Sequence, residues 1–263
     1  MANKYLARDD APFGSDTWKA LDSTMVDVAK SQLVGRRLLH IEGPYGVGLK
    51  VVPLSDATSE SGMTVSRVLP VTMIQQAFTM GMRDLASHER DGLGLDTSAV
   101  ADAALEVARL EDELILQGTA QTPGLLTAEG ASELKLSAWD DVGAAAEDII
   151  QAITTLDKAG FHGPYSLALA PGRYNRLFRR YPRGNFSEME HVRTMVTEGT
   201  FKAPLLESGG VLIASGRQYA SIVLGQDMSI GFVGPAGEEL EFFISESLAL
   251  RLRQPQALCV LKD

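Results

Sequence analysis

Apolar residues recur every three or four positions near the start of the chain, which predicts an amphipathic helix. From Trp18 to Gln32 the spacings along one face are 3, 4, 3 and 4 residues, and four of these five positions are apolar. Asp16 or Thr17 is expected to cap the start of this helix, and Gly35 to end it.

The same pattern predicts two further long helices and one short one. The first opens at Asp96 and ends at Gly118. The second is expected to start at Ser137, where Ser137 and Asp140 resemble a capping box, and a third starts at Ser187 with a full capping box. The apolar stripe of the first consists of Val100, Ala103, Val107, Leu110 and Leu114.

Between Val47 and Met80 the pattern changes to short β-leaning pieces, VVPL, SRVLPV and MIQQAFTM. Pro53, Pro70 and the polar run SDATSESG interrupt them, and proline within such pieces is typical of edge strands. Large apolar residues are too few for this region to pack on itself. We therefore expect a long hairpin arm that needs a partner surface.

Strand-like runs dominate the rest of the chain. YSLALA comes first and is followed by a short helical piece, GRYNRLFRR; GVLIAS, YASIVLG, ELEFFISESLALRL and ALCVLK come later. The order is helix, arm, two long helices, and then mixed helices and strands. That order predicts an α+β fold and not a βαβ alternation.

Composition excludes several classes of partner. The 263 residues carry a net charge of −10, and broad phosphate binding normally needs a basic surface, so nucleic acid is not expected as the main partner. The lone cysteine, Cys259, rules out a disulfide within the chain and fits a reducing cytoplasm. No run of about 18 apolar residues is present, so we expect no membrane span.

The chain has no convincing catalytic or metal-binding constellation. The glycines of GPYGVG, residues 43–48, do not match a phosphate-binding loop and are interpreted as a backbone turn. Glu188 and His191 form one E-x-x-H pair, but a di-iron centre needs a second, so both side chains are expected on a solvated helix face. The acidic run 111–113 is expected either on a solvated face or in contact with basic residues, and Cys259 is expected to be a buried small hydrophobe.

One segment, 172–186, is locally basic and interleaved with aromatic residues. In isolation it resembles a nucleic-acid patch. In an acidic chain, a subunit contact or a positively lined opening is the preferred interpretation. Its arginines are Arg173, Arg176, Arg179, Arg180 and Arg183, and its aromatic residues are Tyr174, Phe178, Tyr181 and Phe186.

Five blocks together resemble a known family. After Trp18 come KSQLVGRRLLHIEGPYG, LEDELILQG, AGFHGPYSLAL, LGQDMSIGF and EFFISESLAL, in this order along nearly the whole chain. The sequence is similar to the encapsulins, the linocin-type shell proteins of bacterial and archaeal nanocompartments. The resemblance implies the Hong Kong 97 phage major-capsid-like fold, with a peripheral domain containing a spine helix, an axial domain and an extended loop.

The resemblance also implies a domain organisation and a function. Copies would close into an icosahedral, cytoplasmic shell, which is not an enzyme, around cargo. The alternative is a phage or prophage major capsid protein that packages DNA. The implied segments are 1–45 for the N-terminal helix and docking segment, 46–78 for the extended loop, 79–130 for the peripheral domain with its spine helix, 131–225 for the axial domain and 226–263 for the returning C-terminal strands.

In this family, cargo enzymes dock inside the shell through a short C-terminal peptide, and a peroxidase or a ferritin-like protein is a possible cargo. Two departures from relatives affect the implied groove: Ala29 replaces a common aromatic residue, and His40 replaces a common acidic one. His40 could make docking depend on pH, since imidazoles titrate near ~6.5. Carried over by position, the groove comprises Ala29, Leu33, Arg36, Leu39, His40 and Ile41, with Ile230 and Phe243 as apolar neighbours.

Two further expectations come from the resemblance. Some relatives bind flavin beside a tryptophan in the segment that matches 78–90, but the matched position here is Arg83, so neither flavin nor another cofactor is expected. The basic loop falls in the axial domain, where pores lie, and its arginines would favour anions. The residues expected to line or border the pore are Tyr181, Pro182, Arg183, Gly184 and Asn185.

Overall fold

The computed structural model describes residues 4–182 and 184–263. The chain divides into two compact units. The first unit comprises Met1–Leu33, Gly43–Glu111 and Leu224–Ala249; the second comprises Val34–Glu42, Asp112–Val223 and Leu250–Asp263. Both contain helices and strands, which confirms the α+β class. No helix in the described part of the chain combines the length and the apolar character needed to cross a membrane.

The long helices of the first unit are α1 (Ser15–Gln32), α3 (Met82–Asp91) and α4 (Ser98–Leu116), whose last residues belong to the second unit. Two short 3-10 turns, η1 (Lys4–Leu6) and η2 (Arg8–Asp10), precede α1. Asp96 accepts a hydrogen bond from the Ser98 amide at 2.9 Å, as expected for the residue that opens α4. The apolar pattern did not predict α3, in which Leu85 is the one buried residue.

The expected ends of α1 were wrong at both termini. Gly14, not Asp16 or Thr17, occupies the N-cap. Thr17 is buried in the first turn, where its hydroxyl donates to Glu89 of α3. The helix ends at Gln32, and Gly35 instead begins a second helix, α2 (Gly35–Leu38). A Cβ at Gly35 would lie 2.5 Å from Ile115 Cδ1. The role of this glycine is therefore to allow close packing against Ile115, and it does not end a helix.

A four-stranded sheet of order β1-β11-β12-β6 contains the longest strands. β6 (Thr72–Gly81) is antiparallel to β12 (Glu239–Leu252), and β1 (His40–Glu42) is parallel to the start of β11 (Ala220–Ala236). Helix α1 packs on the first-unit part of this sheet through Trp18. Its ring meets Phe242 edge-on at 6.1 Å, and Phe242 stacks on Phe78 at 5.3 Å. These aromatic contacts fix which face of the sheet is covered.

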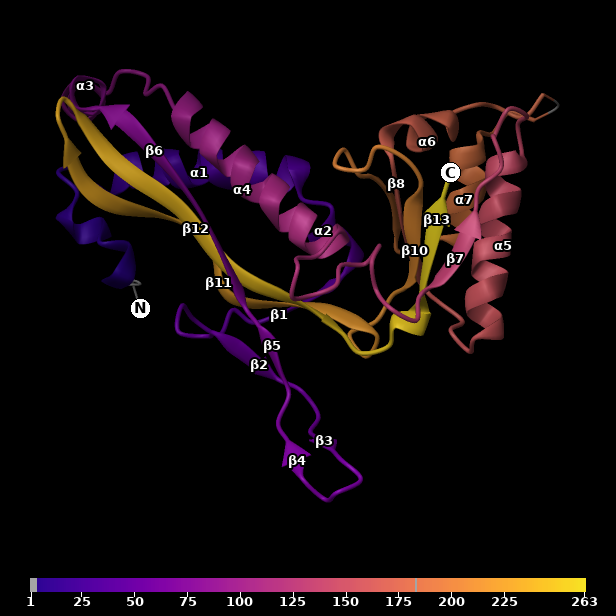
Figure 1. Ribbon diagram of the computed structural model, residues 1–263. Coiled ribbons are helices and arrows are strands. Elements are labelled where there is room, and N and C mark those ends of the chain that lie inside the picture. Colours follow the sequence, from indigo (N-terminus) through magenta and orange to yellow (C-terminus); the bar gives the residue numbers. More distant parts are fainter. Residues whose placement is uncertain (1–3, 183) are drawn as a thin grey trace. The chain divides into compact units, whose positions relative to one another are not determined.

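The hairpin arm is present but shorter than expected (Figure 1). β2 (Val51–Pro53) pairs with β5 (Val68–Pro70), and beyond them β3 (Ala57–Thr58) pairs with β4 (Thr64–Val65). MIQQAFTM, which the sequence pattern grouped with the arm, lies in β6 and pairs along its length with β12. The residues of β6 alternate in burial because one of its faces packs on the core of the first unit.

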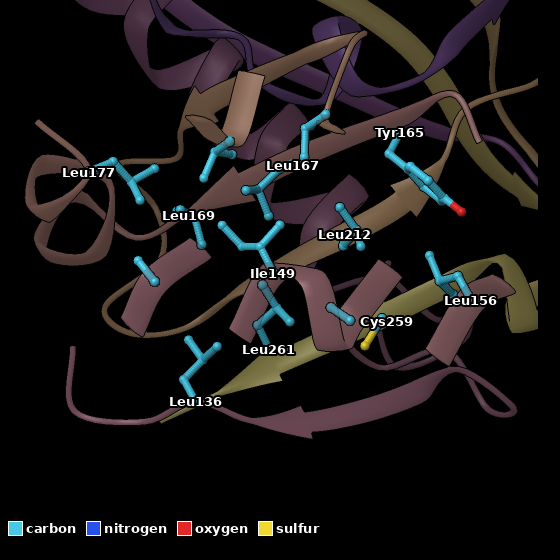
Figure 2. Close-up of a cluster of buried hydrophobic side chains, with 14 of the residues drawn as sticks. Leu136, Ile149, Leu156, Tyr165, Leu167, Leu169, Leu177, Leu212, Cys259 and Leu261 are labelled. Atoms are coloured by element: carbon cyan, nitrogen blue, oxygen red, sulfur yellow. The ribbon is translucent and has the colours of Figure 1, made fainter. Parts of the chain in front are cut away.

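The second unit is built on a five-stranded sheet of order β7-β13-β10-β8-β9, packed against α5 (Ala144–Lys158) and α7 (Glu188–Met195). Side chains of the sheet and of α5 form one buried apolar cluster (Figure 2). A short helix, α6 (Pro171–Arg176), and a 3-10 turn, η3 (Pro255–Ala257), complete the unit. The strands are β7 (Ser132–Lys135), β8 (Tyr165–Leu169), β9 (Gly199–Lys202), β10 (Gly210–Ala214) and β13 (Leu258–Lys262).

Helix α5 begins at Ala144 and not at Ser137, so the expected capping box there was wrong. Asp148, within α5, accepts hydrogen bonds from the Ser137 amide at 2.7 Å, the Ser137 hydroxyl at 2.9 Å and the Trp139 indole N–H at 2.7 Å. These bonds hold 137–143 as a loop over the helix. The capping box of Ser187 and Glu190 at the start of α7 is confirmed.

Residues 43–48 form a turn, as predicted. Gly43 has φ +112°, a conformation that L-residues with a Cβ rarely adopt. The Tyr45 amide donates to the Leu224 carbonyl at 3.0 Å, and the Gly46 amide donates to the Gly225 carbonyl at 2.5 Å. These two bonds attach the turn to β11, so the hairpin arm starts from a fixed point.

Substituting Gly43 should be more damaging than substituting Gly46. A Cβ at Gly43 would lie 2.5 Å from the Leu224 carbonyl oxygen, whereas one at Gly46 would meet nothing within 4 Å, although both residues have positive φ. Overlap of this kind costs about 1–3 kcal/mol. We expect Gly43→Ala to lower the free energy of unfolding in urea by at least ~1 kcal/mol more than Gly46→Ala. Equal losses would contradict this role of Gly43.

Cys259 should be unreactive in the folded protein. Its side chain is buried in the cluster of Figure 2, and burial raises its pKa to about 11. The thiolate is the nucleophile, so at pH 8 only about a thousandth of the thiol is reactive. Ellman's reagent should therefore modify the chain slowly until guanidinium chloride is added, and then titrate one thiol. Rapid modification of the native chain would show that the cluster opens readily.

Candidate functional site

The implied docking residues of the first unit are mostly covered by its own side chains. Ala29 and Leu33, near the end of α1, are each 6% exposed and pack with Ala108 of α4 and the half-buried Met228 of β11. Ile230 is 0% exposed. These three side chains are therefore buried beneath the protein surface and expose little area to a bound peptide.

A hollow of about 680 Å³ lies where α1, β11 and the two 3-10 turns meet. Met228 links the hollow to the cluster of Ala29 and Leu33. The apolar lining consists of Leu6, Ala7, Met25, Val26 and Met228. Sequence reasoning missed Val26, although a valine beside the apolar stripe of a helix, 38% exposed in the structure, is the kind of residue that a bound chain covers. The charged residues at the hollow are Lys4, Arg8, Asp9, Asp10 and Asp22.

Arg8 fixes one wall of this hollow. Its guanidinium donates to both carboxylate oxygens of Asp22, at 2.8 and 2.5 Å, and its Nε donates to the Ile230 carbonyl at 2.8 Å. The same guanidinium lies 4.4 Å above the ring of Trp18. A bidentate pair with a cation–π contact is a rigid arrangement, so the turns before α1 are tied to both the helix and the strand.

The structure does not bring Phe243 to the surface that contains Ala29 and Leu33. Neighbouring residues in a strand point to opposite faces of the sheet. Because Phe242 packs against Trp18 of α1, Phe243 projects from the other face, where its ring lies against Gly231. Helix α1 and Phe243 therefore lie on opposite faces of the sheet and do not line one groove.

The other implied docking residues belong to the second unit. Leu39 is buried, His40 is exposed, and Arg36 and Ile41 are half-buried. Leu39 and His40 line a hollow of about 350 Å³. Arg37, which sequence reasoning did not select, lines it too, whereas Arg36 and Ile41 do not.

Asp112 positions the start of this second-unit segment. Its carboxylate accepts hydrogen bonds from the Val34 amide, at 2.9 and 3.0 Å to its two oxygens, and from the Gly35 amide at 2.8 Å. The amides at a helix start have no partners within the helix, and this carboxylate satisfies them. Glu111 and Asp112 are both buried, so the first of the two alternatives expected for 111–113, a solvated face, was wrong for these two residues.

The basic segment is used largely within the second unit. Arg173 donates to the Ser137 carbonyl at 2.7 Å, and Arg179 donates to the Trp139 carbonyl at 2.7 Å and pairs with Glu188 at 3.0 Å. Arg176 donates to the Ala138 carbonyl. Hydrogen bonds from Arg173, Arg176 and Arg179 to its carbonyl groups thus hold the loop before α5 in place. Arg180 is exposed, and Arg183 lies outside the described residues.

Glu188 and His191 were expected on a solvated helix face, and for Glu188 this was wrong. Glu188 is buried and accepts from the Gly143 amide at 2.7 Å as well as from Arg179. His191 Nδ1 lies 2.9 Å from the Tyr181 hydroxyl. Both side chains of the E-x-x-H pair therefore have structural partners. The described residues contain no group of three or more side chains suited to hold a metal ion.

Four of the implied pore residues, Tyr181, Pro182, Gly184 and Asn185, are described by the structure and lie in a loop, in which Pro182 and Asn185 are exposed. The Gly184 amide donates to the Tyr181 carbonyl at 3.1 Å, and the rings of Tyr181 and Phe186 lie 5.0 Å apart. Loss of water around the Tyr181 hydroxyl, reinforced by the charge of Glu188, raises its pKa. Tyr181, Pro182 and Gly184 line an open hollow with Phe186, and Asn185 is exposed.

Arg83, at the position implied for flavin binding in relatives, is the second residue of α3. It borders a hollow of about 710 Å³ in the first unit. Three carboxylates, Asp84, Glu238 and Glu239, border the same hollow. This lining is polar and presents no aromatic ring for stacking.

Comparisons with known proteins give one consistent result. The Linocin_M18 family model, described as an encapsulating protein for peroxidase, matches residues 3–249. The type 1 encapsulin shell protein EncA of Myxococcus xanthus is 30% identical over 276 residues, covering 98% of this chain and 96% of that protein. The type 1 encapsulin shell protein of Rhodococcus erythropolis is 29% identical over 264 residues, covering 97% and 98%.

Solved structures agree on the fold. A virus-like particle from Pyrococcus furiosus superposes with a TM-score of 0.77 at 22% identity, covering 94% of this chain and 100% of that one. The capsid of Myoviridae Phage XM1 superposes with a TM-score of 0.62 at 17% identity, covering 85% and 88%. These likenesses confirm the capsid-like fold implied by the sequence, and the family match over nearly the whole chain confirms the resemblance. The chain belongs to the encapsulin, or Linocin_M18, family of shell proteins, whose role is structural and not catalytic.

Proposed function

We propose that copies of this chain close into an icosahedral shell in the cytoplasm and enclose cargo enzymes that dock through a C-terminal peptide. Membership of the encapsulin family supports the shell. The observation that carries the proposal is the hairpin arm, because it exposes apolar side chains that its own chain does not cover. The domain roles implied for 46–78, 79–130 and 131–225 are part of the proposal, except that residues 72–78 lie in β6 and not in the extended loop.

The arm has the composition of a contact surface. Met63 and Val65 are 66% and 62% exposed, and Val51 and Val68 are also exposed. A two-stranded hairpin is marginally stable by itself, and its unpaired edges are available to another chain. A second copy would supply both apolar surface and strand edges. Burying one such side chain contributes about 1.5–3 kcal/mol, and a closed symmetric shell repeats the gain at every contact.

The alternative, a capsid protein that packages DNA, shares the fold but is less well supported. A net charge of −10 opposes broad contact with phosphates. In addition, Arg173, Arg176 and Arg179 bind carbonyl and carboxylate groups of their own chain. An enclosed protein is therefore the favoured content.

Two cargo classes have support from the relatives. The family description names a peroxidase. A ferritin-like–encapsulin shell fusion protein of Pyrococcus furiosus is 27% identical over 194 residues, covering 73% of this chain and 53% of that protein. We propose a cargo of one of these two kinds for the present chain.

The proposed docking surface for the apolar part of a cargo tail is the first-unit hollow. Val26 and Met228 would contact the tail, with the buried Met25, Ala29, Leu33 and Ile230 beneath them. The loop of Tyr181, Pro182, Gly184 and Asn185, together with Arg183, is proposed to border the pore through which substrates reach the cargo. Because the loop is short and exposed, its sequence can vary without disturbing the core of the unit.

A charge on the arm should prevent assembly. Val65→Asp places a carboxylate in the proposed contact, whereas Val65→Ile retains a β-branched apolar side chain. We expect Val65→Ile to elute as particles in size-exclusion chromatography and Val65→Asp to elute as folded small species, with equal circular dichroism. Particles from Val65→Asp, or a small species from the unaltered protein, would contradict the proposal. Nuclease-resistant nucleic acid inside the particles would favour the alternative.

A charge in the first-unit hollow should empty the shell without destroying it. Val26 is partly exposed, so Val26→Asp avoids the folding defect expected of a charge at the buried Leu33. Ser31→Asp, at an exposed position on the same helix, is the matched control. We expect co-purifying cargo to fall at least ~10-fold for Val26→Asp and to be unchanged for Ser31→Asp. Normal loading of Val26→Asp particles would place docking elsewhere.

A further inference from the structure

We propose that strand β6 pairs with β6 of a second copy of this chain, so that two first-unit sheets join edge to edge across a two-fold axis. The inference rests on the proposed function, because an icosahedral shell contains two-fold axes. It adds to the exposed hairpin arm a second contact between copies, which is made mainly by backbone hydrogen bonds.

One edge of β6 is left unpaired by its own sheet. Among the described strands, β6 pairs with β12 alone, and the register runs without interruption from Thr72 to Gly81. The next amide, that of Met82, donates to the Glu238 carbonyl at 3.1 Å and continues this register. Successive amides along a strand point to opposite edges. The even-numbered residues of β6 therefore bond to β12, and the odd-numbered residues from 73 to 81 point to the open edge.

The outward-pointing backbone groups of β6 have no backbone partner within residues 4–182 and 184–263. A long bond of 3.5 Å from the Gln76 side chain reaches the Ala77 carbonyl, as expected for a carbonyl that faces away from β12. Backbone N–H and C=O groups in a row are a template for a further strand, which supplies both acceptors and donors. This edge is therefore suited to pair with another chain.

β6 lacks the features that commonly protect an edge strand. Its ten residues, TMIQQAFTMG, include no charged residue and no proline. Proteins often place lysine or proline on an exposed edge to prevent pairing with other chains. The other edges follow that rule: Pro53 lies in β2, Pro70 lies in β5, and β7 and β9, each of four residues, contain Lys135 and Lys202. β6 is thus a long edge that remains available for pairing.

The same composition points to a second β6 as the partner strand. In an antiparallel pair across a two-fold axis, the strand meets its own sequence, so a charge near the axis would face a like charge and destabilise the pair. β6 carries no charge, and it matches a second β6 over all ten residues. The arm strands are at most three residues long and contain proline, so they match this edge less well.

Full overlap of the outward-pointing groups fixes the register of the pair. Ala77 then faces its own counterpart on the axis, Gln75 faces Thr79, and Met73 faces Gly81. The side chains at 73, 75, 77 and 79 are exposed, and those at 74, 78 and 80 are buried on the other face. The buried face is the one that α1 covers through Trp18, so α1 would cover the same face in both copies.

Ala77→Cys tests this register, because it should form a disulfide between copies in assembled shells treated with oxidised glutathione. Hydrogen-bonded residues of an antiparallel pair have Cα atoms about 5.5 Å apart, which is within reach of a disulfide. The native Cys259 is buried and does not compete. We expect most Ala77→Cys chains to run as dimers in non-reducing gel electrophoresis. Intact particles that yield only monomers would overturn the inference.

Gln75→Cys, at an exposed position on the same face, is the matched control. Its counterpart would lie about 13 Å away along the strands, at ~3.3 Å per residue, so this variant should remain monomeric. Adding Thr79→Cys to it should restore the dimer. A dimer from Gln75→Cys alone, with none from Ala77→Cys, would overturn the proposed register.

Amide hydrogen exchange tests the pairing without a new side chain. In assembled shells the odd-numbered amides from 73 to 79 should exchange at least ~10-fold more slowly than in the unassembled Val65→Asp protein, because a paired amide exchanges only when its bond opens. Protection of these amides in shells whose Ala77→Cys chains stay monomeric would assign the edge to a different strand and overturn self-pairing. Intact particles without protection would reject this inference alone, whereas the absence of particles from the unaltered protein would reject the proposed function.

Discussion

Buried carboxylates impose the constraint on which the irregular backbone of the second unit depends. A carboxylate removed from water is costly unless several N–H or O–H donors replace its hydration. Asp112 accepts hydrogen bonds from the amides of Val34 and Gly35. Asp148 accepts them from the amide and hydroxyl of Ser137 and from the indole N–H of Trp139. Glu188 accepts them from the Gly143 amide and from Arg179. Each acid lies on a helix, and each set of donors lies largely on a loop. Each loop therefore follows its helix, because in that position the carboxylate and its donors satisfy one another.

This constraint explains where the candidate functional segments sit. Asp112 fixes the start of α2, four residues before Leu39 and His40 line the second-unit hollow. Glu188 directs Arg179 inward and lies near Tyr181, at the beginning of the exposed loop. Most arginines of the basic segment therefore bind groups of their own unit. The sequence pattern resembled an external basic patch, but these side chains form mainly internal contacts.

Apolar residues have two uses in this chain. In the cluster of Figure 2 they are fully buried and stabilise the fold of one chain. On the hairpin arm Val51, Met63, Val65 and Val68 are exposed. This division is what a shell protein requires, because the surfaces that close the shell must be left uncovered by the chain that carries them. The turn at Gly43, attached to β11 by two hydrogen bonds, sets the position from which the arm leaves.

The sequence by itself determined the elements whose signal is local and repeated. The stripe of α4, the capping box of α7, the long strand β12 and the turn at 43–48 all follow from residues close together in the chain, since periodicity and turn chemistry need no distant partner. The collinear blocks also determined the family. The tertiary structure decided the rest. Hydrogen bonds to Asp148 hold the preceding residues as a loop, so α5 starts later than the pattern predicted. β6 pairs with β12 and is therefore not part of the arm. Because Phe242 packs on Trp18, Phe243 projects from the opposite face of the sheet. The last two outcomes depend on partners far away in sequence, and the first depends on side-chain hydrogen bonds over 9 and 11 residues, so the local apolar pattern did not predict any of them.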